Sequence, residues 1–148
     1  MRGYFGVAVY HPKRSINVGS LWRTAHILGA KFLATIGHRY RNQASDTVKA
    51  TRHTPLFEYE SFDKFYENIP RDCKLVGLEL VPEGISIEKF SHPHRAIYLL
   101  GAEDHGLPEQ VLARCHHLVR LPGTFSLNLA VAGSIVIYDR VRERIPNG

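Results

Sequence analysis

Five short apolar runs, rich in β-branched and aromatic residues, recur along the chain and predict β-strands. They cover residues 5–10, 32–36, 74–80, 96–100 and 117–121. Runs with apolar residues at consecutive positions are typical of strands that are buried on both faces. Because helical patterns alternate with these runs, the chain predicts an α/β fold with a mostly parallel sheet and helices on both faces.

The helical patterns lie at residues 18–28, 46–52, 62–68, 108–114 and 127–144. In the first of them Val18, Leu21 and Trp22 fall on one apolar stripe. Asn17 stands just before this stripe, where it is a candidate N-cap. Pro108 would occupy the first turn of the fourth helix, a position that tolerates the missing N–H of proline.

The last helical pattern differs from the others, because it is apolar nearly all round for three turns. Arg140, Arg142 and Arg144 follow at the end where the helix dipole favours cations. A helix of this kind needs cover on more than one side. Two interpretations stay open: an ordinary core helix, or a helix covered by a second subunit in a homodimer.

The composition indicates one globular domain over residues 1–148, because 44% of the residues are hydrophobic and 22% are charged. Disordered and collagen-like chains are excluded by the same values.

Lys and Arg number 19 against 14 Asp and Glu, and the resulting formal charge of +5 suits a polyanionic partner. Two cysteines, Cys73 and Cys115, are too few for a disulfide framework, so we expect the reducing cytoplasm. The run at 5–10 is too short for a membrane span.

Several common kinds of site do not fit the residues. The first predicted strand is followed by His11 and Pro12, without the glycine pattern of a dinucleotide-binding fold. The segment 101–106 has the glycine spacing of a phosphate loop, but Leu107 and Pro108 stand where Lys and Ser or Thr are required. The histidine pairs at 92/94 and 116/117 lack a third ligand at familiar spacing, so we expect no metal site.

Three remaining segments carry polar residues beside predicted strands, where α/β proteins bind ligands. They read N-x-x-x-x-x-R from Asn17 to Arg23, G-x-E-x-x-G-L from Gly101 to Leu107, and S-L-N from Ser126 to Asn128. In order and spacing they resemble the signature motifs of the SpoU/TrmH family of SPOUT-class RNA 2′-O-ribose methyltransferases, and the chain resembles its minimal single-domain members. The resemblance implies a C-terminal trefoil knot, S-adenosylmethionine as cofactor and an RNA substrate, with tRNA favoured. The homodimer is expected from the last helical pattern, which needs cover on more than one side.

The resemblance also implies roles for individual residues. Arg23 would activate the ribose hydroxyl, and we interpret it as a cation that stabilises the developing alkoxide, since guanidinium is a poor base. The other catalytic residues implied are Asn17, Glu103, Ser126 and Asn128. The cofactor site implied comprises Leu78, Gly101, Gly106, Leu121 and Ser126. Ser126 is in addition a candidate N-cap of the last helix.

A basic segment between residues 31 and 53 is a candidate RNA-binding surface. It has five basic residues against one acid, Asp46, which gives a local charge of +4. The RNA-contacting residues expected are Lys13, Arg14, Arg39, Arg41 and Arg52.

The third motif departs from the family, because only Gly123, Thr124 and Phe125 separate Pro122 from Ser126. A second hypothesis is therefore a catalytically silent RNA-binding module with the same fold.

Overall fold

The structure, a computed structural model, describes residues 3–37, 53–79, 82–101, 106–123 and 127–142. Its strands form one sheet in the order β3-β2-β1-β6-β4-β7-β5. The bounds are β1 Tyr4–Tyr10, β2 Leu33–Ile36, β3 Leu56–Tyr59, β4 Lys74–Leu78, β5 Ile85–Ser86, β6 Arg95–Leu100 and β7 His117–Arg120. All the strand pairings are parallel, which confirms the predicted class of sheet. The trefoil knot implied by the resemblance stays a prediction.

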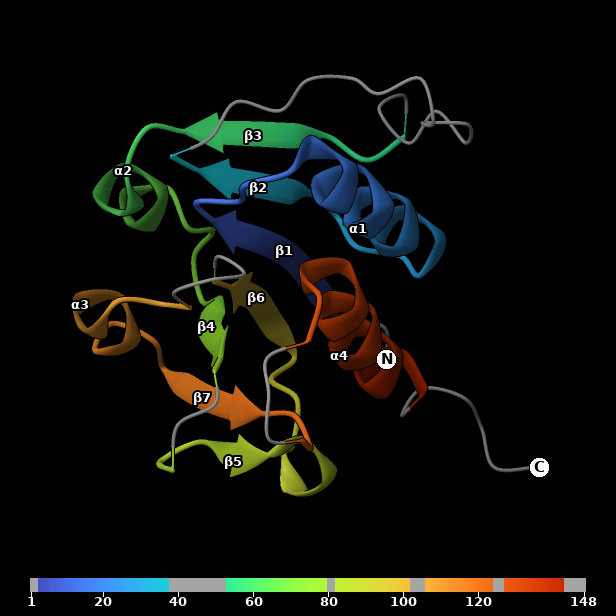
Figure 1. Ribbon diagram of the computed structural model, residues 1–148, viewed down its shortest axis with the longest axis vertical. Coiled ribbons are helices and arrows are strands. Elements are labelled where there is room, and N and C mark those ends of the chain that lie inside the picture. The colour runs from blue at the N-terminus through green and yellow to red at the C-terminus, as the bar shows by residue number, and fades with distance from the viewer. Residues whose placement is uncertain (1–2, 38–52, 80–81, 102–105, 124–126, 143–148) are drawn as a thin grey trace.

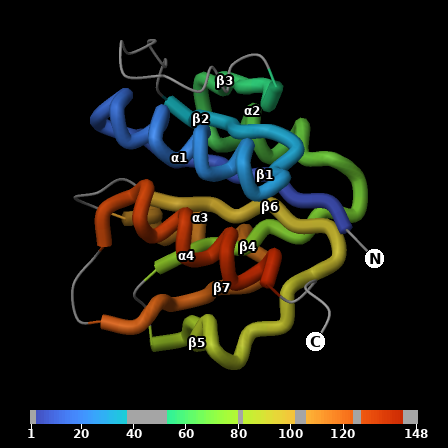
Figure 2. Tube along the Cα trace, turned by 90° about the vertical axis from the view of Figure 1, so that its right-hand side faces the viewer, coloured from blue at the N-terminus to red at the C-terminus, as the bar shows by residue number. Residues whose placement is uncertain are grey.

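Helices cover both faces of this sheet, as predicted. Their bounds are α1 Ser15–Ile27, α2 Phe62–Glu67, α3 Glu109–Leu112 and α4 Leu129–Arg142, with a 3-10 turn at Ile87–Lys89. Helices α1 and α4 lie side by side on one face, and α2 and α3 lie on the other (Figure 1 and Figure 2). The sheet therefore separates two apolar cores, one beneath α1 and α4 and the other beneath α2 and α3. No helix in the described ranges has the length and apolar character needed to cross a membrane.

The ends of the helices correct three predictions. Helix α1 begins at Ser15 with Arg14 in the N-cap position, so Asn17 lies in the first turn and does not cap it. Helix α3 is one turn long, and Pro108 is its N-cap residue instead of its first helical residue. Helix α4 begins at Leu129, and its cap is Asn128 instead of Ser126. The helix predicted at 46–52 lies outside the described residues.

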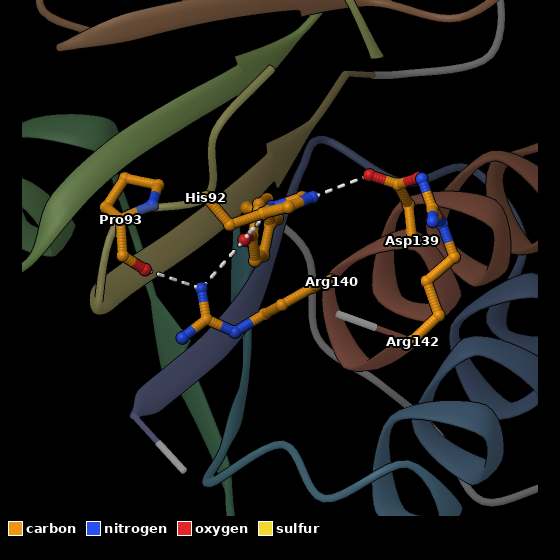
Figure 3. Close-up of polar contacts among 6 residues, drawn as sticks. His92, Pro93, Asp139, Arg140 and Arg142 are labelled. Atoms are coloured by element: carbon orange, nitrogen blue, oxygen red, sulfur yellow. Dashed lines mark hydrogen bonds and ion pairs between the residues drawn. The ribbon is translucent and has the colours of Figure 1, made fainter. Parts of the chain in front are cut away.

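The C-terminal end of α4 is fixed by a buried polar cluster, shown in Figure 3. Arg140 is only 4% exposed and donates hydrogen bonds to the carbonyls of Pro93 and His94 and to the Tyr98 hydroxyl. His92 contacts the same hydroxyl through Nδ1 and Asp139 through Nε2, both at 2.7 Å. Arg140 thus joins the segment before β6 to α4, a role that the dipole argument did not predict.

Candidate active site

The candidate site lies at the carboxyl edge of the sheet, where the segments that lead to the three motifs leave β1, β6 and β7. Strand β4 is the link between two of them, because Leu78 pairs with Leu100 on one side and with Val119 on the other. Gly101 follows β6 directly, and Leu121 follows β7 directly. In a parallel sheet the carboxyl ends of neighbouring strands meet at one edge. The structure therefore brings to one edge four of the five residues predicted to line a cofactor site, Leu78, Gly101, Gly106 and Leu121, and the fifth, Ser126, lies outside the described residues.

The first and third motifs meet through two asparagines that are 111 residues apart in the sequence. The side-chain amide of Asn128 donates to Oδ1 of Asn17 at 3.3 Å. The other end of the same side chain caps α4, since its Oδ1 accepts from the backbone N–H of Ala130 at 2.8 Å and of Val131 at 3.3 Å. The cap fixes which way the amide group of Asn128 faces, and so directs its N–H toward Asn17.

The two glycines of the second motif pack closely against each other. A β-carbon on Gly101 would overlap with the backbone carbonyl carbon of Gly106 and lie 2.7 Å from the backbone nitrogen of Leu107. Gly106 has φ +64°, a conformation that glycine adopts at little cost. The G-x-E-x-x-G-L spacing is therefore explained by geometry: the chain leaves β6 at Gly101 and returns against itself at Gly106 with bare main chain on both sides.

Glu79 is a residue of this edge that the sequence analysis did not select. It follows β4 directly, and its Oε2 accepts the backbone N–H of Leu107 at 2.7 Å. A β-carbon on Gly106 would overlap with the same oxygen. The sequence signal is an acidic residue at the end of an apolar run, but Glu79 falls inside the strand predicted at 74–80.

Arg23 lies on the exposed side of α1, six residues after Asn17 in the same helix. Ideal helix geometry places it about 9 Å farther along the axis and about 120° around it. Its neighbours at helical spacing are Ser20 and Ile27, of which Ser20 lines an apolar groove between α1 and α4. Within one chain, Asn17 therefore contacts Asn128, whereas Arg23 lies at the border of the groove between α1 and α4.

The remaining predicted residues fall into two groups. Lys13 and Arg14 are exposed and precede the first turn of α1, next to the motif that contains Asn17. Five others lie outside the described residues: Glu103, Ser126, Arg39, Arg41 and Arg52.

The two cysteines do not add a nucleophile to this edge. Burial raises the pKa of the Cys115 thiol to about 11, against a small opposing effect of a hydrogen bond with the Gly77 backbone. A β-carbon on Gly77 would lie 2.8 Å from Sγ of Cys115, so the thiol fills the space that the glycine leaves. Burial also raises the pKa of Cys73. Both thiols are therefore protonated at neutral pH and serve packing.

Comparison with protein families gives a match over nearly all of the chain. The model of the SpoU rRNA Methylase family matches residues 4–138. An uncharacterised tRNA/rRNA methyltransferase of Archaeoglobus fulgidus is 28% identical over 135 residues, which is 86% of this chain. The chain spans only 60% of the length of that relative.

Comparison with solved structures gives the same fold. A structure concerned with the 2-OH methylation of C/U34 on tRNA has a TM-score of 0.83 and 27% identity, and the match covers 97% of this chain and 98% of the other. The AviRb methyltransferase of Streptomyces viridochromogenes, solved in complex with AdoMet, has a TM-score of 0.81 and 24% identity over 97% of this chain and 62% of its own. At that identity the second likeness concerns the fold alone.

Proposed function

The chain belongs to the SpoU rRNA Methylase family, and from that premise we propose that it is an RNA 2′-O-ribose methyltransferase that uses S-adenosylmethionine. The observation that carries the proposal is the contact between Asn17 and Asn128 at the edge where the glycine loop of the second motif begins. The first and third motifs contact each other through this pair, and the second motif follows β6, the strand that pairs with β1. This supports an enzyme that holds a methyl donor beside an acceptor.

The described residues at this edge fit S-adenosylmethionine. Gly101 and Gly106 leave main-chain groups without side-chain cover, which suits hydrogen bonding to an adenine edge. Leu78 and Leu121 are 8% and 9% exposed, so their apolar surfaces reach the edge of the core where a ring can lie against them. We assign these four residues, with Ser126, to the cofactor site.

When bound, S-adenosylmethionine supplies a methyl group on a positively charged sulfur. The residues of the chain must align the ribose hydroxyl with that group, exclude water and favour loss of the hydroxyl proton. We assign stabilisation of the developing alkoxide to the guanidinium of Arg23, because it stays protonated and presents several donors. Asn17 and Asn128, together with Glu103 and Ser126, are assigned to orienting the polar groups of the reaction.

A homodimer forms part of this proposal. The exposed face shared by α1 and α4 carries large apolar side chains: Ile16, Ile27, Val131, Ile135 and Tyr138, each at least 38% exposed. Residues of both helices line one apolar groove, Ser20 and Thr24 from α1 and Val131 and Ile135 among those from α4. A contiguous apolar face on paired helices favours a second copy of the same chain. Arg23 lies one helical turn from Ser20 of the groove and Ile27 of this face, so a partner seated there would lie close to the guanidinium.

The RNA substrate follows from charge together with the likeness to a structure concerned with methylation of tRNA. The formal charge of +5 favours a polyanion. Lys13 and Arg14 stand beside the first motif, and Arg39, Arg41 and Arg52 belong to the basic segment. We therefore propose tRNA as the substrate and the reducing cytoplasm as the compartment, in keeping with two free cysteines.

Arg23→Ala tests the assignment of the chemistry. We expect S-adenosylmethionine to bind this variant in calorimetry about as well as the wild type, while tritium transfer from the labelled cofactor to total tRNA falls by 100-fold or more, the order that loss of an oxyanion-stabilising group costs. Arg71→Ala is the matched control, because Arg71 is an exposed arginine before β4 at the opposite edge. Near-normal transfer by Arg23→Ala would contradict the role of Arg23. Absence of transfer by the wild type with tRNA binding retained would instead favour the silent RNA-binding module.

A further inference from the structure

Glu79 connects three strand ends at the carboxyl edge of the sheet. It follows β4, its backbone N–H donates to the carbonyl of Val119 in β7 at 3.0 Å, and its carboxylate accepts from the N–H of Leu107 at 2.7 Å. Leu107 in turn is the last residue of the motif that begins after β6. One residue thus fixes the spacing of β4, β7 and the return of the second-motif segment.

The position of the Glu79 carboxylate depends on Gly106. A β-carbon on Gly106 would overlap with Oε2 and lie 3.1 Å from Oε1. Both carboxylate oxygens therefore lie against the bare main chain of the second glycine. The side chain of Glu79 is half-buried, so water competes only in part for the hydrogen bond. A bond from a backbone N–H to an ionised acceptor is among the stronger hydrogen bonds in proteins.

We infer that Glu79 is a positioning residue for the cofactor site, which sets the main chain of the second motif at Gly106 and Leu107 in its binding shape before the cofactor arrives. This inference rests on the proposed function. Glu79 is placed for this task because it neighbours Leu78 in sequence and Gly106 in space, and both are assigned to the cofactor site. Its effect passes through the loop and does not require contact between the carboxylate and the cofactor.

Preorganisation through a loop predicts a particular pattern of affinities. A misplaced main chain weakens binding of any ligand that uses it, whatever the charge of that ligand. S-adenosylmethionine carries a positive sulfur and S-adenosylhomocysteine a neutral one, although their adenosine parts are the same. Loss of Glu79 should therefore weaken the binding of both ligands by the same factor. A carboxylate that acted directly on the positive sulfur would instead affect only the binding of S-adenosylmethionine.

The test compares Glu79→Ala, Glu79→Gln and the control Glu83→Ala by calorimetry with both ligands, at a temperature at which each variant is folded. Glu83 is an exposed acid only four residues away. We expect Glu79→Ala to bind both ligands about tenfold more weakly, the order that one charge-assisted hydrogen bond contributes. Glu79→Gln keeps an acceptor oxygen and should recover most of the loss. Glu83→Ala should bind as the wild type does.

Two results would overturn the inference while the proposed function stands: unchanged affinity of Glu79→Ala for both ligands, or a loss confined to S-adenosylmethionine. A wild-type protein that binds neither ligand would overturn the proposed function itself.

The pair of Glu79 with Gly106 gives a second readout. Gly106→Ala should weaken binding in the wild-type background, and less so in a Glu79→Ala background, because the overlap with the carboxylate is then absent while the backbone strain at φ +64° remains in both. Strictly additive effects would show that the two residues do not act together.

Discussion

The two ends of α4 use polar residues in opposite ways. At the N-terminal end Asn128 is exposed, and its hydrogen bond to Asn17 is 3.3 Å long. At the C-terminal end the side chain of His92 is 3% exposed and that of Asp139 is 13% exposed, and their hydrogen bond is 2.7 Å. The first end leaves polar groups where a ligand can reach them, and the second end uses them within the fold.

The buried cluster links four side chains through short hydrogen bonds. Arg140 donates to the Tyr98 oxygen at 2.9 Å, and His92 joins that hydroxyl to Asp139 through its two ring nitrogens. Arg140 also lies over the rings of Phe5 and Tyr98. Hydrogen bonds among buried polar groups rigidify a structure, and in the described residues they leave Nε of Arg140 as the one buried side-chain polar atom without a partner. The buried cluster therefore lies at the edge of the sheet opposite to the proposed binding site.

The largest effect on stability should come from Arg140→Ala. It removes three hydrogen bonds and the packing against two aromatic rings, so we expect the free energy of unfolding to fall by about 3 kcal/mol. The midpoint of thermal unfolding should fall by about 10 °C. Differential scanning calorimetry measures both. At a temperature at which the variant is folded, binding of S-adenosylmethionine should stay unchanged, because the proposed site is at the other edge.

Arg142→Ala is the matched control for this prediction. Arg142 has a side chain that is 50% exposed and pairs with the same Asp139 at 2.9 Å. An exposed ion pair of this kind contributes little, so the expected loss is below about 0.5 kcal/mol. Equal losses for Arg140→Ala and Arg142→Ala would mean that burial of the cluster does not matter, and the contrast between the two ends would then be wrong.

An intermediate effect on stability is expected at the other end of α4. Asn128→Ala removes the cap and should cost about 1 kcal/mol in denaturant unfolding. Asn128→Asp keeps an oxygen for the N–H groups of Ala130 and Val131, and its charge suits the helix N-terminus, so its stability should stay near that of the wild type. The aspartate cannot donate to Asn17.

The Asn128 variants therefore separate capping from catalysis. We expect Asn128→Asp to lose about tenfold in single-turnover methyl transfer to tRNA, an order set by one lost orienting hydrogen bond. Full turnover by Asn128→Asp, together with lost stability in Asn128→Ala, would show that Asn128 acts only as a helix cap. The proposed role of this end of α4 in catalysis would then be wrong.

The sequence predicted the buried strands and missed two strands at the edges of the sheet. The five predicted runs became β1, β2, β4, β6 and β7. The first four are buried at most positions, as expected for consecutive apolar residues, whereas β7 has only Val119 buried. Strand β3 at Leu56–Tyr59 is half-exposed to exposed, and β5 at Ile85–Ser86 has only two residues. Edge strands of this kind leave too little apolar pattern to be distinguished from loops.

The sequence placed the candidate site on the right segments but could not give its contacts. Motif spacing selected Asn17 and Asn128, yet their hydrogen bond depends on how α1 packs against α4. The cap of α4 was misassigned because Ser126 and Asn128 are both good caps, and only the start of the helix decides between them. The contacts of Glu79 and Arg140 could not be predicted, because the partner of a charged residue is known only from the three-dimensional structure.

The smallest expected effect is a pH dependence at the amino edge, where His116 accepts the backbone N–H of Leu75 on Nδ1 at 2.8 Å. Burial, and then the charges of Lys74 and His117, lower the pKa of His116 below its ordinary value of 6.5. Its contribution to stability is therefore complete above pH 6.5 and is lost as the pH falls through the lowered pKa. His116→Asn supplies an acceptor that does not titrate, so urea midpoints between pH 7.5 and pH 5 should fall less steeply than in the wild type. His94→Asn, a change of an exposed histidine near the same edge, should keep the wild-type slope. Identical slopes for all three proteins would show that protonation of His116 costs the fold nothing, and that the amino edge is fixed by the buried cluster alone.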